Sequence, residues 1–229
     1  MIEPVSFPEH LNRLRWAQGD HVLIAAPTKC GKTTLVSKLV DRRSHVVSFV
    51  SKLRDDTFGR EYPGWRRYER WPRTVPDYDR RILLWPKPGK TLRETRDKHR
   101  EVFREALDRI TLEGNRTVVI DEGLYMSEPK FVGLGDEIGM LFYFGRSGGI
   151  TMVLLTQRPA WIPKVVYSST THAWIARTRD RDDLRRLGDF GGLDTREVQQ
   201  TVARLPRRHD FLYLNPQGDA RPAIINTRR

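Results

Sequence analysis

The hydrophobic positions of the chain fall into short runs that are separated by longer polar or amphipathic segments. Six such runs are rich in aliphatic residues and lie at residues 21–26, 45–50, 81–86, 117–121, 150–156 and 172–176. Apolar runs of this length predict buried strands. Between them, residues 32–43 and 91–112 carry apolar positions at helical spacing. Strands that alternate with helices predict an α/β fold, in which a mostly parallel sheet is covered by helices on both faces and a ligand binds at the carboxyl ends of the strands.

Two further segments add to this pattern. Residues from about 55 to 81 are rich in arginine, aromatic residues and proline and follow neither the helical nor the strand period. They predict an insertion-like excursion between two strands. Near the end, FLYLN and PAIIN (residues 211–215 and 222–226) predict a closing pair of strands. Because the chain has no repeats and no obvious linker, we expect residues 1–229 to form a single domain.

The first strand leads into APTKCGKTT, residues 26–34, which fits a phosphate-binding loop (P-loop) that precedes a helix. An alanine replaces the usual first glycine, and Pro27 has no N–H to donate, so the later residues must supply the anion-binding amides. Gly31 lets the backbone approach the phosphates, Lys32 reaches the β- and γ-phosphates, and the Thr33 hydroxyl holds Mg²⁺. The residues expected to bind ATP are Pro27, Thr28, Lys29, Cys30, Gly31, Lys32, Thr33 and Thr34.

Acidic and amide side chains follow two of the predicted strands. The run at residues 117–121 ends in Asp121 and is followed by Glu122, and Gln157 follows another run. An acidic residue at a strand end beside a P-loop holds the Mg²⁺ shell, which is the role expected of Asp121. Glu122 is then placed to polarise an attacking water, so hydrolysis is expected and not binding alone. We expect Lys32, Glu122 and Gln157 to be catalytic, whereas the alternative for the acidic pair is a solvated turn.

The stretch GRSGGITMVLLTQRP, residues 145–159, carries an arginine, a glycine-bearing turn, an apolar strand and TQRP. This order, after the P-loop and the acidic pair, resembles the FtsK–HerA superfamily of ring-forming, DNA-pumping ATPases over roughly residues 22–187. The resemblance implies a RecA-like P-loop NTPase fold, Gln157 as a γ-phosphate sensor, and a ring, expected to be a hexamer. It also implies that a neighbouring subunit supplies an arginine to the site. Arg146 is the first candidate for that arginine and Arg177 is the second, although either can instead form a surface or structural ion pair.

The charge of the chain adds a candidate partner. The net charge is +12, and of 41 basic residues only nine are lysine. Arginine binds phosphate with a planar fork, so this balance favours sequence-independent contacts to double-stranded DNA, although an arginine-rich surface without that function is the alternative. Candidate pore segments are residues 60–81 and 126–135. We expect the aromatic residues Trp65, Tyr68 and Trp71 to form a small satellite core rather than to contact DNA. The basic residues expected to face a pore are Arg66, Arg67 and Arg70.

The sequence also favours an intracellular setting. Cys30 is the only cysteine, so the chain forms no internal disulfide. We expect no transmembrane segment. The start MIEPVSFPEHLNRLRW contains acidic residues and no long apolar run, so it does not fit a signal peptide. The expected location is the cytoplasm of a host cell, or a virion.

Together these features predict an ATP-driven double-stranded DNA translocase, whose ATPase activity is stimulated by DNA. An ATPase core of this size resembles the genome-packaging ATPases of membrane-containing icosahedral viruses. That resemblance implies a capsid vertex or membrane protein as a further partner. Two alternatives stay open: an assembly or secretion ATPase of the same superfamily, and a small-molecule phosphotransferase.

Overall fold

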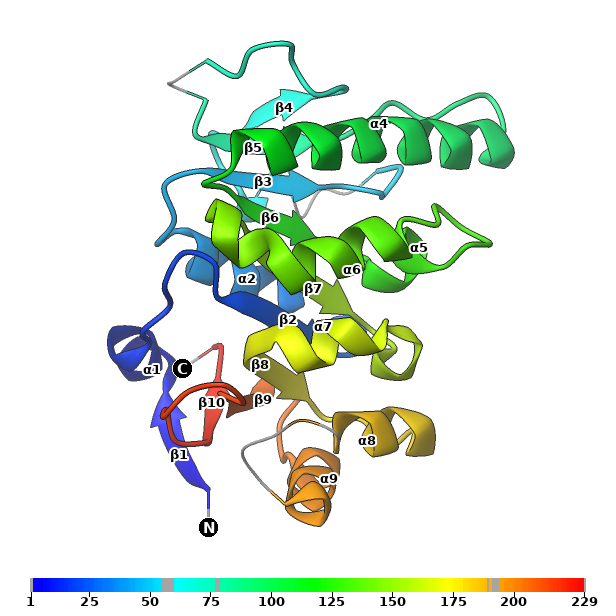
Figure 1. Cartoon of the computed structure of the whole chain (residues 1–229). Helices are drawn as coiled ribbons and strands as arrows, with labels where there is room; N and C mark the ends of the chain where they lie inside the picture. Colours follow the sequence, from blue (N-terminus) through cyan, green and yellow to red (C-terminus); the bar gives the residue numbers. More distant parts are fainter. Residues whose placement is uncertain (1, 55–59, 77–78, 189, 191–193, 229) are drawn as a thin grey trace.

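A single ten-stranded sheet runs through the computed structural model, which describes residues 2–54, 60–76, 79–188, 190 and 194–228 (Figure 1). The strand order is β1-β10-β9-β8-β2-β7-β6-β3-β5-β4. The strands are β1 (Glu3–Ser6), β2 (His21–Ala25), β3 (Val46–Phe49), β4 (Arg66–Tyr68), β5 (Arg81–Leu84), β6 (Thr117–Ile120), β7 (Thr151–Thr156), β8 (Thr170–Ala176), β9 (Asp210–Leu214) and β10 (Ala223–Asn226). The seven strands from β8 to β4 are parallel, and β9 is antiparallel to both β8 and β10. The predicted α/β fold with a mostly parallel sheet and a closing strand pair is therefore confirmed.

The helices cover both faces of this sheet. The α-helices are α1 (Phe7–Arg13), α2 (Lys32–Val40), α4 (Leu92–Glu113), α5 (Gly123–Ser127), α6 (Gly135–Phe144), α7 (Lys164–Ser169), α8 (Arg181–Leu187) and α9 (Thr195–Arg204), and the 3₁₀ turns are η1 (Gly145–Gly148) and η2 (Pro159–Trp161). In Figure 1, α4, α6 and α7 lie in front of the sheet and α2 lies behind it. No helix in the described ranges is long and apolar enough to cross a membrane.

Alternating strand residues supply a hydrophobic core to each face. In β2, Leu23 and Ala25 pack with α4 and α6, whereas Val22 and Ile24 pack with α1 and α2. Side chains of a strand point alternately to its two faces, so a strand buried on both sides must be apolar throughout. All five residues of β2 are buried, and the four after His21 form the continuous apolar run that leads into the P-loop.

Helix α4, which lies over the β3 and β6 side of the sheet, has a well-defined start. The Thr91 hydroxyl accepts a hydrogen bond from the Glu94 amide at 3.1 Å, and the Glu94 carboxylate accepts one from the Lys90 amide at 2.8 Å. This reciprocal arrangement satisfies amides that a helix start otherwise leaves unpaired. It fixes the 22-residue helix α4, which the periodicity predicts to within one residue at each end.

The arginine-rich excursion differs from its prediction. Its residues 55–59 and 77–78 lie outside the described residues, but residues 66–68 form β4, an edge strand parallel to β5. A three-residue strand with two exposed arginines carries no apolar alternation, which is why its sequence does not predict it. The expected satellite core is wrong as well. Trp71 belongs to the core under α4, while Trp65 packs against the core on the opposite face.

The topology brings several chain segments to one edge of the sheet. The parallel strands β2, β6, β7 and β8 all end at this edge. Strand β9 is antiparallel to β8, so it begins at this edge. Its first residue, Asp210, pairs there with Asn226, the last residue of β10. This carboxyl edge is where a parallel α/β sheet binds its ligand.

Candidate nucleotide site

The P-loop closes over the end of β2 in a conformation suited to anion binding. Lys29 and Gly31 both have positive φ values, 63° and 90°, and Gly31 is the N-cap residue of α2. Lys32 is buried, and its Nζ donates hydrogen bonds to the carbonyl oxygens of Ala26 at 2.6 Å and Pro27 at 3.2 Å. The loop thus holds a lysine ammonium and the amino end of a helix in one place, which is the chemistry that binds phosphate.

The acidic pair lies beside this loop at the end of β6. Asp121 is buried and forms an ion pair with Lys52, whose Nζ lies 3.0 Å from the Asp121 carboxylate. Glu122 accepts hydrogen bonds from the Gln157 amide nitrogen at 3.2 Å to each carboxylate oxygen. The Gln157 carbonyl oxygen in turn accepts one from the Thr28 hydroxyl at 2.6 Å. A continuous chain of hydrogen bonds therefore connects the acidic pair to the P-loop through Gln157.

Burial shifts the pKa values of the two central charged groups in opposite directions. It raises the pKa of Glu122, an effect to which the negative charge of Asp121 adds and which Lys32 and Gln157 partly offset. It lowers the pKa of Lys32, against the attraction of Glu122 and Asp121. A carboxylate whose pKa is raised by its surroundings is suited to act as a general base.

These side chains line one cavity of about 820 Å³. It includes every residue from Thr28 to Thr34 except Cys30, together with Asp121, Glu122 and Gln157. Cys30 packs against the core around α2, and Pro27 contributes only a carbonyl oxygen to Lys32. The rest of the lining lies outside the predicted nucleotide-binding and catalytic residues: Lys52, Arg60, Glu61, Arg208, His209, Thr227 and Arg228.

Some of these additional residues reach the site from unexpected segments. Glu61, from the excursion, accepts hydrogen bonds from Thr34 and Ser37 at 3.4 Å each. Lys52 comes from the segment after β3, and His209 and Thr227 flank the closing strand pair. No local motif marks these positions, and only the strand order brings them to the loop.

The side-chain oxygens that line this cavity fit an Mg²⁺ ion that would be held mainly by a bound nucleotide. Thr33 and Asp121, the two residues predicted to bind the metal, both line the cavity. Within the described residues, no cluster of three or more His, Cys, Asp or Glu side chains forms a metal cage of its own. Mg²⁺ commonly binds through one or two protein oxygens, substrate phosphates and water, and the Thr33 hydroxyl and the Asp121 carboxylate are oxygen donors of this kind.

The two candidate arginines lie at opposite edges of the sheet. Arg146 lies in η1, before β7, and forms an ion pair with Asp20, which precedes β2. It is therefore at the amino edge, away from the cavity of its own chain. Arg177 follows β8 directly and is exposed at the carboxyl edge, on the P-loop side. Neither lines the cavity, so a role for either in catalysis depends on a second subunit.

No known family model matches the sequence, and no curated protein matches it either. Solved structures do match its fold. The genome-packaging NTPase B204 from Sulfolobus turreted icosahedral virus 2, in complex with ATP-gammaS, is 17% identical and aligns over 90% of this chain and 95% of its own, with a TM-score of 0.59. The DNA-packaging ATPase B204 from Sulfolobus turreted icosahedral virus is 16% identical over 91% and 98%, with a TM-score of 0.63.

A second kind of structural neighbour is much larger. The cytoplasmic domain of the type VII secretion ATPase EccC from Thermomonospora curvata is 14% identical, with a TM-score of 0.56. The alignment covers 92% of this chain and 25% of EccC. The predicted resemblance is thus confirmed at the level of fold: this chain has the architecture of the viral genome-packaging NTPase B204 and of the type VII secretion ATPase EccC.

Proposed function

We propose that the protein is an Mg²⁺-dependent ATPase that acts as a ring and translocates double-stranded DNA, as a viral genome-packaging motor does. The observation that carries the proposal is the hydrogen-bonded connection from the P-loop through Gln157 to Glu122. This geometry supports hydrolysis, since Glu122 can take a proton from a water that Gln157 orients against the γ-phosphate. Lys32 would stabilise the charge on the transferred phosphate.

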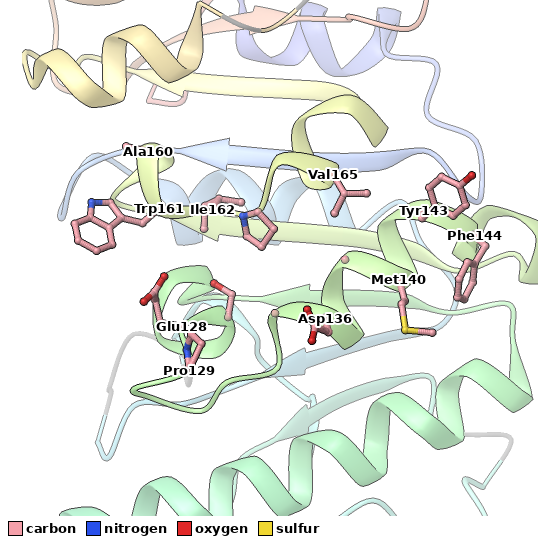
Figure 2. A pocket seen from close by; sticks show the side chains of 14 residues that line it. Glu128, Pro129, Asp136, Met140, Tyr143, Phe144, Ala160, Trp161, Ile162 and Val165 are labelled. Carbon is pink, nitrogen blue, oxygen red and sulfur yellow. The ribbon is translucent and has the colours of Figure 1, made fainter.

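An apolar groove supports the assembly of several copies. It has a volume of about 820 Å³ and lies between the loop after α5, helix α6 and the segment from η2 to α7. Figure 2 shows Tyr143 and Phe144 at one end of this groove and Trp161 at the other. Their exposed fractions are 77%, 42% and 48%, which is typical of surfaces that contact another protein. Arg146 follows Phe144 by two residues. A second copy bound in this groove would therefore also lie close to Arg146, the first candidate arginine.

The basic surface supports DNA as the partner. The predicted pore residues Arg66, Arg67 and Arg70 are exposed, although Arg70 also forms an ion pair with Glu101 at 2.9 Å. Sequence-independent DNA binding depends on phosphate contacts from such residues. Residues 126–135, the other pore candidate, are held against α4, because Arg100 donates hydrogen bonds to the carbonyl oxygens of Phe131 and Val132. A cytoplasmic or virion location, and a capsid or membrane protein as docking partner, belong to the same proposal.

The test is ATP hydrolysis by the purified protein at low salt, with and without double-stranded DNA, over a range of protein concentrations. We expect turnover per subunit to rise with DNA and to increase with protein concentration, because the site needs a neighbouring arginine. Lys32→Ala should abolish nucleotide binding in the same preparation. A turnover number that depends neither on DNA nor on protein concentration would contradict the proposal and favour a phosphotransferase.

A secretion ATPase is the second candidate, since EccC has the same fold. The two candidates differ in the activator. A secretion ATPase of this fold would assemble and hydrolyse ATP without a response to DNA. If turnover rises with protein concentration but does not change when DNA is added, the secretion ATPase is therefore favoured over the DNA motor.

A further inference from the structure

The end of the β9–β10 hairpin lies directly over the P-loop. A methyl group added to Gly31 would lie 3.1 Å from the ring nitrogen Nδ1 of His209 and 3.1 Å from the hydroxyl oxygen of Thr227. His209 immediately precedes β9, and Thr227 immediately follows β10. Two side chains from the end of the chain thus face the glycine at which the phosphate-binding helix begins.

Hydrogen bonds fix this end of the hairpin. The Thr227 amide donates to the His209 carbonyl oxygen at 3.2 Å. The buried carboxylate of Asp210 accepts from the Arg207 amide at 2.9 Å and from the Asn226 side chain at 2.6 Å. These bonds hold the backbone that carries the His209 and Thr227 side chains, which lowers the cost of ordering it around a ligand.

His209 Nδ1 and the Thr227 hydroxyl are both buried atoms without a hydrogen-bond partner among the described residues. Buried polar atoms are normally paired, and those that are not call for an explanation. Both atoms belong to residues that line the same cavity as Lys32 and Glu122. Both atoms are occluded against Gly31 in this conformation, so a rotation of either side chain toward the cavity would let a ligand there satisfy it.

The strand order sets the direction in which such a ligand lies. Strand β2, which carries the P-loop, has β7 and β6 on one side and β8, β9 and β10 on the other. Asp121, Glu122 and Gln157 follow β6 and β7, so the reacting phosphate belongs to that side. The remainder of a nucleotide must then extend toward the hairpin.

On this basis we propose that the hairpin end binds the nucleoside part of the nucleotide, with His209 and Thr227 as its hydrogen-bonding contacts. The assignment rests on the proposed function, because it takes the cavity to be an ATP site. An imidazole and a hydroxyl match the hydroxyls of a ribose and the edge of a base. Arg208 and Arg228, both exposed at the cavity rim, carry guanidinium planes that stack on aromatic rings such as a base.

The test compares ATP with inorganic tripolyphosphate, which carries the phosphates without the nucleoside. Binding of each to the full chain is measured by calorimetry with Mg²⁺. The variants are His209→Ala, Thr227→Val and Thr227→Ser. Each of the first two should weaken ATP binding up to about tenfold and leave tripolyphosphate binding unchanged, because one hydrogen bond to the nucleoside is lost. Thr227→Ser, which keeps the hydroxyl, should bind ATP as the wild type does.

The matched control is His45→Ala, which removes an exposed histidine just before β3, at the amino edge of the sheet. Thermal denaturation checks that each variant is folded. The two substitutions flank different strands, so the assignment stays testable if one of them prevents folding. ATP affinity unchanged in both His209→Ala and Thr227→Val would overturn the assignment, as would an equal loss of ATP and tripolyphosphate binding. Wild-type protein that binds neither compound would instead overturn the proposed function, and this assignment with it.

Discussion

Lys32 and Glu122 lie in one cavity, where burial disfavours the charge on both. Each group offsets part of that effect on the other, because the ammonium and the carboxylate attract. Their place in one site was predictable from sequence, since a P-loop and an acidic pair after a strand are local patterns. His209 and Thr227 were not predictable, because they approach Gly31 from the far end of the chain. Only the order of strands in the sheet places them there.

The raised pKa of Glu122 has a consequence for the pH dependence of turnover. A general base works as the carboxylate, so the ATPase rate should fall as the pH drops through the raised pKa of Glu122. The acid limb of kcat should therefore lie above the ordinary glutamate pKa of about 4.3. Glu122→Gln should lower kcat by about 10²–10⁴-fold at neutral pH.

Steady-state kinetics between pH 4.5 and 8 measure both effects. Glu105→Gln, an exposed glutamate on α4, serves as the control and should keep the wild-type profile. A wild-type profile with no acid limb in this range, or an active Glu122→Gln variant, would count against Glu122 as the base.

Among the elements, those with a strong apolar period were predictable and those defined by their neighbours were not. The expected bounds of β2, β6 and β7 agree with the structure to within one residue. By contrast, β1 and β4 are short, mostly exposed edge strands that exist because a partner strand offers hydrogen bonds. The closing strands β9 and β10 were predicted as a pair, but their place beside β8 depends on the tertiary structure.

At this scale, Asp210 is expected to stabilise the hairpin end. Its carboxylate is buried and accepts two hydrogen bonds, from the Arg207 amide and the Asn226 side chain. Asp210→Ala leaves the Arg207 amide without this partner and should lower the free energy of unfolding by about 1–3 kcal/mol. Urea denaturation measures the loss. Asp219→Ala, an exposed aspartate in the turn of the same hairpin, is the control and should change little. Equal stability of the two variants would show that Asp210 does not stabilise the hairpin.

Considered as a whole, the molecule has its candidate site residues at both edges of the sheet. The nucleotide cavity lies at the carboxyl edge, and Arg146 lies at the amino edge in its ion pair with Asp20. The fold class and the cavity position follow from the alternation of strands and helices. Contacts between copies of the chain cannot be predicted in this way, because no pattern in a single sequence determines which surfaces meet.

A trans role for Arg146 predicts complementation between two inactive variants. Arg146→Ala should bind ATP but hydrolyse it about 10³-fold more slowly, since an arginine supplied in trans has an effect of this order. Mixing it with Glu122→Gln should restore part of the turnover, because some interfaces then hold both an intact Glu122 and an intact Arg146. Arg177→Ala is compared under the same conditions. Absence of rescue, or full activity of Arg146→Ala alone, would argue against Arg146 in this role.

Four buried histidines make the stability of the fold depend on pH. Burial lowers the pKa of His10, His21, His99 and His172 to about 4 in each case. The unfolded chain binds protons at these positions below about pH 6.5, whereas the folded chain does so only near pH 4. The free energy of unfolding should therefore be at its full value above pH 6.5 and fall as the pH drops toward 4, by up to about 3 kcal/mol per histidine.

Urea denaturation at pH 7.5 and at pH 5 tests this dependence. His99→Phe should reduce the difference between the two pH values, because one of the four groups no longer titrates. A pH difference that is unchanged in His99→Phe would contradict the neutral, buried state of that histidine.

The pairing of the first strand with the last has a consequence for the order in which the chain folds. Glu3 to Ser6 pair with Ala223 to Asn226, and the hairpin that carries those residues also faces Gly31. Contacts between residues so distant in sequence form slowly, because a long loop must close first. During synthesis, the seven parallel strands can assemble while the hairpin is still missing. The hairpin would then cover the P-loop only after Asn226 and Thr227 have left the ribosome. Full ATP affinity should therefore be reached in the last step of folding.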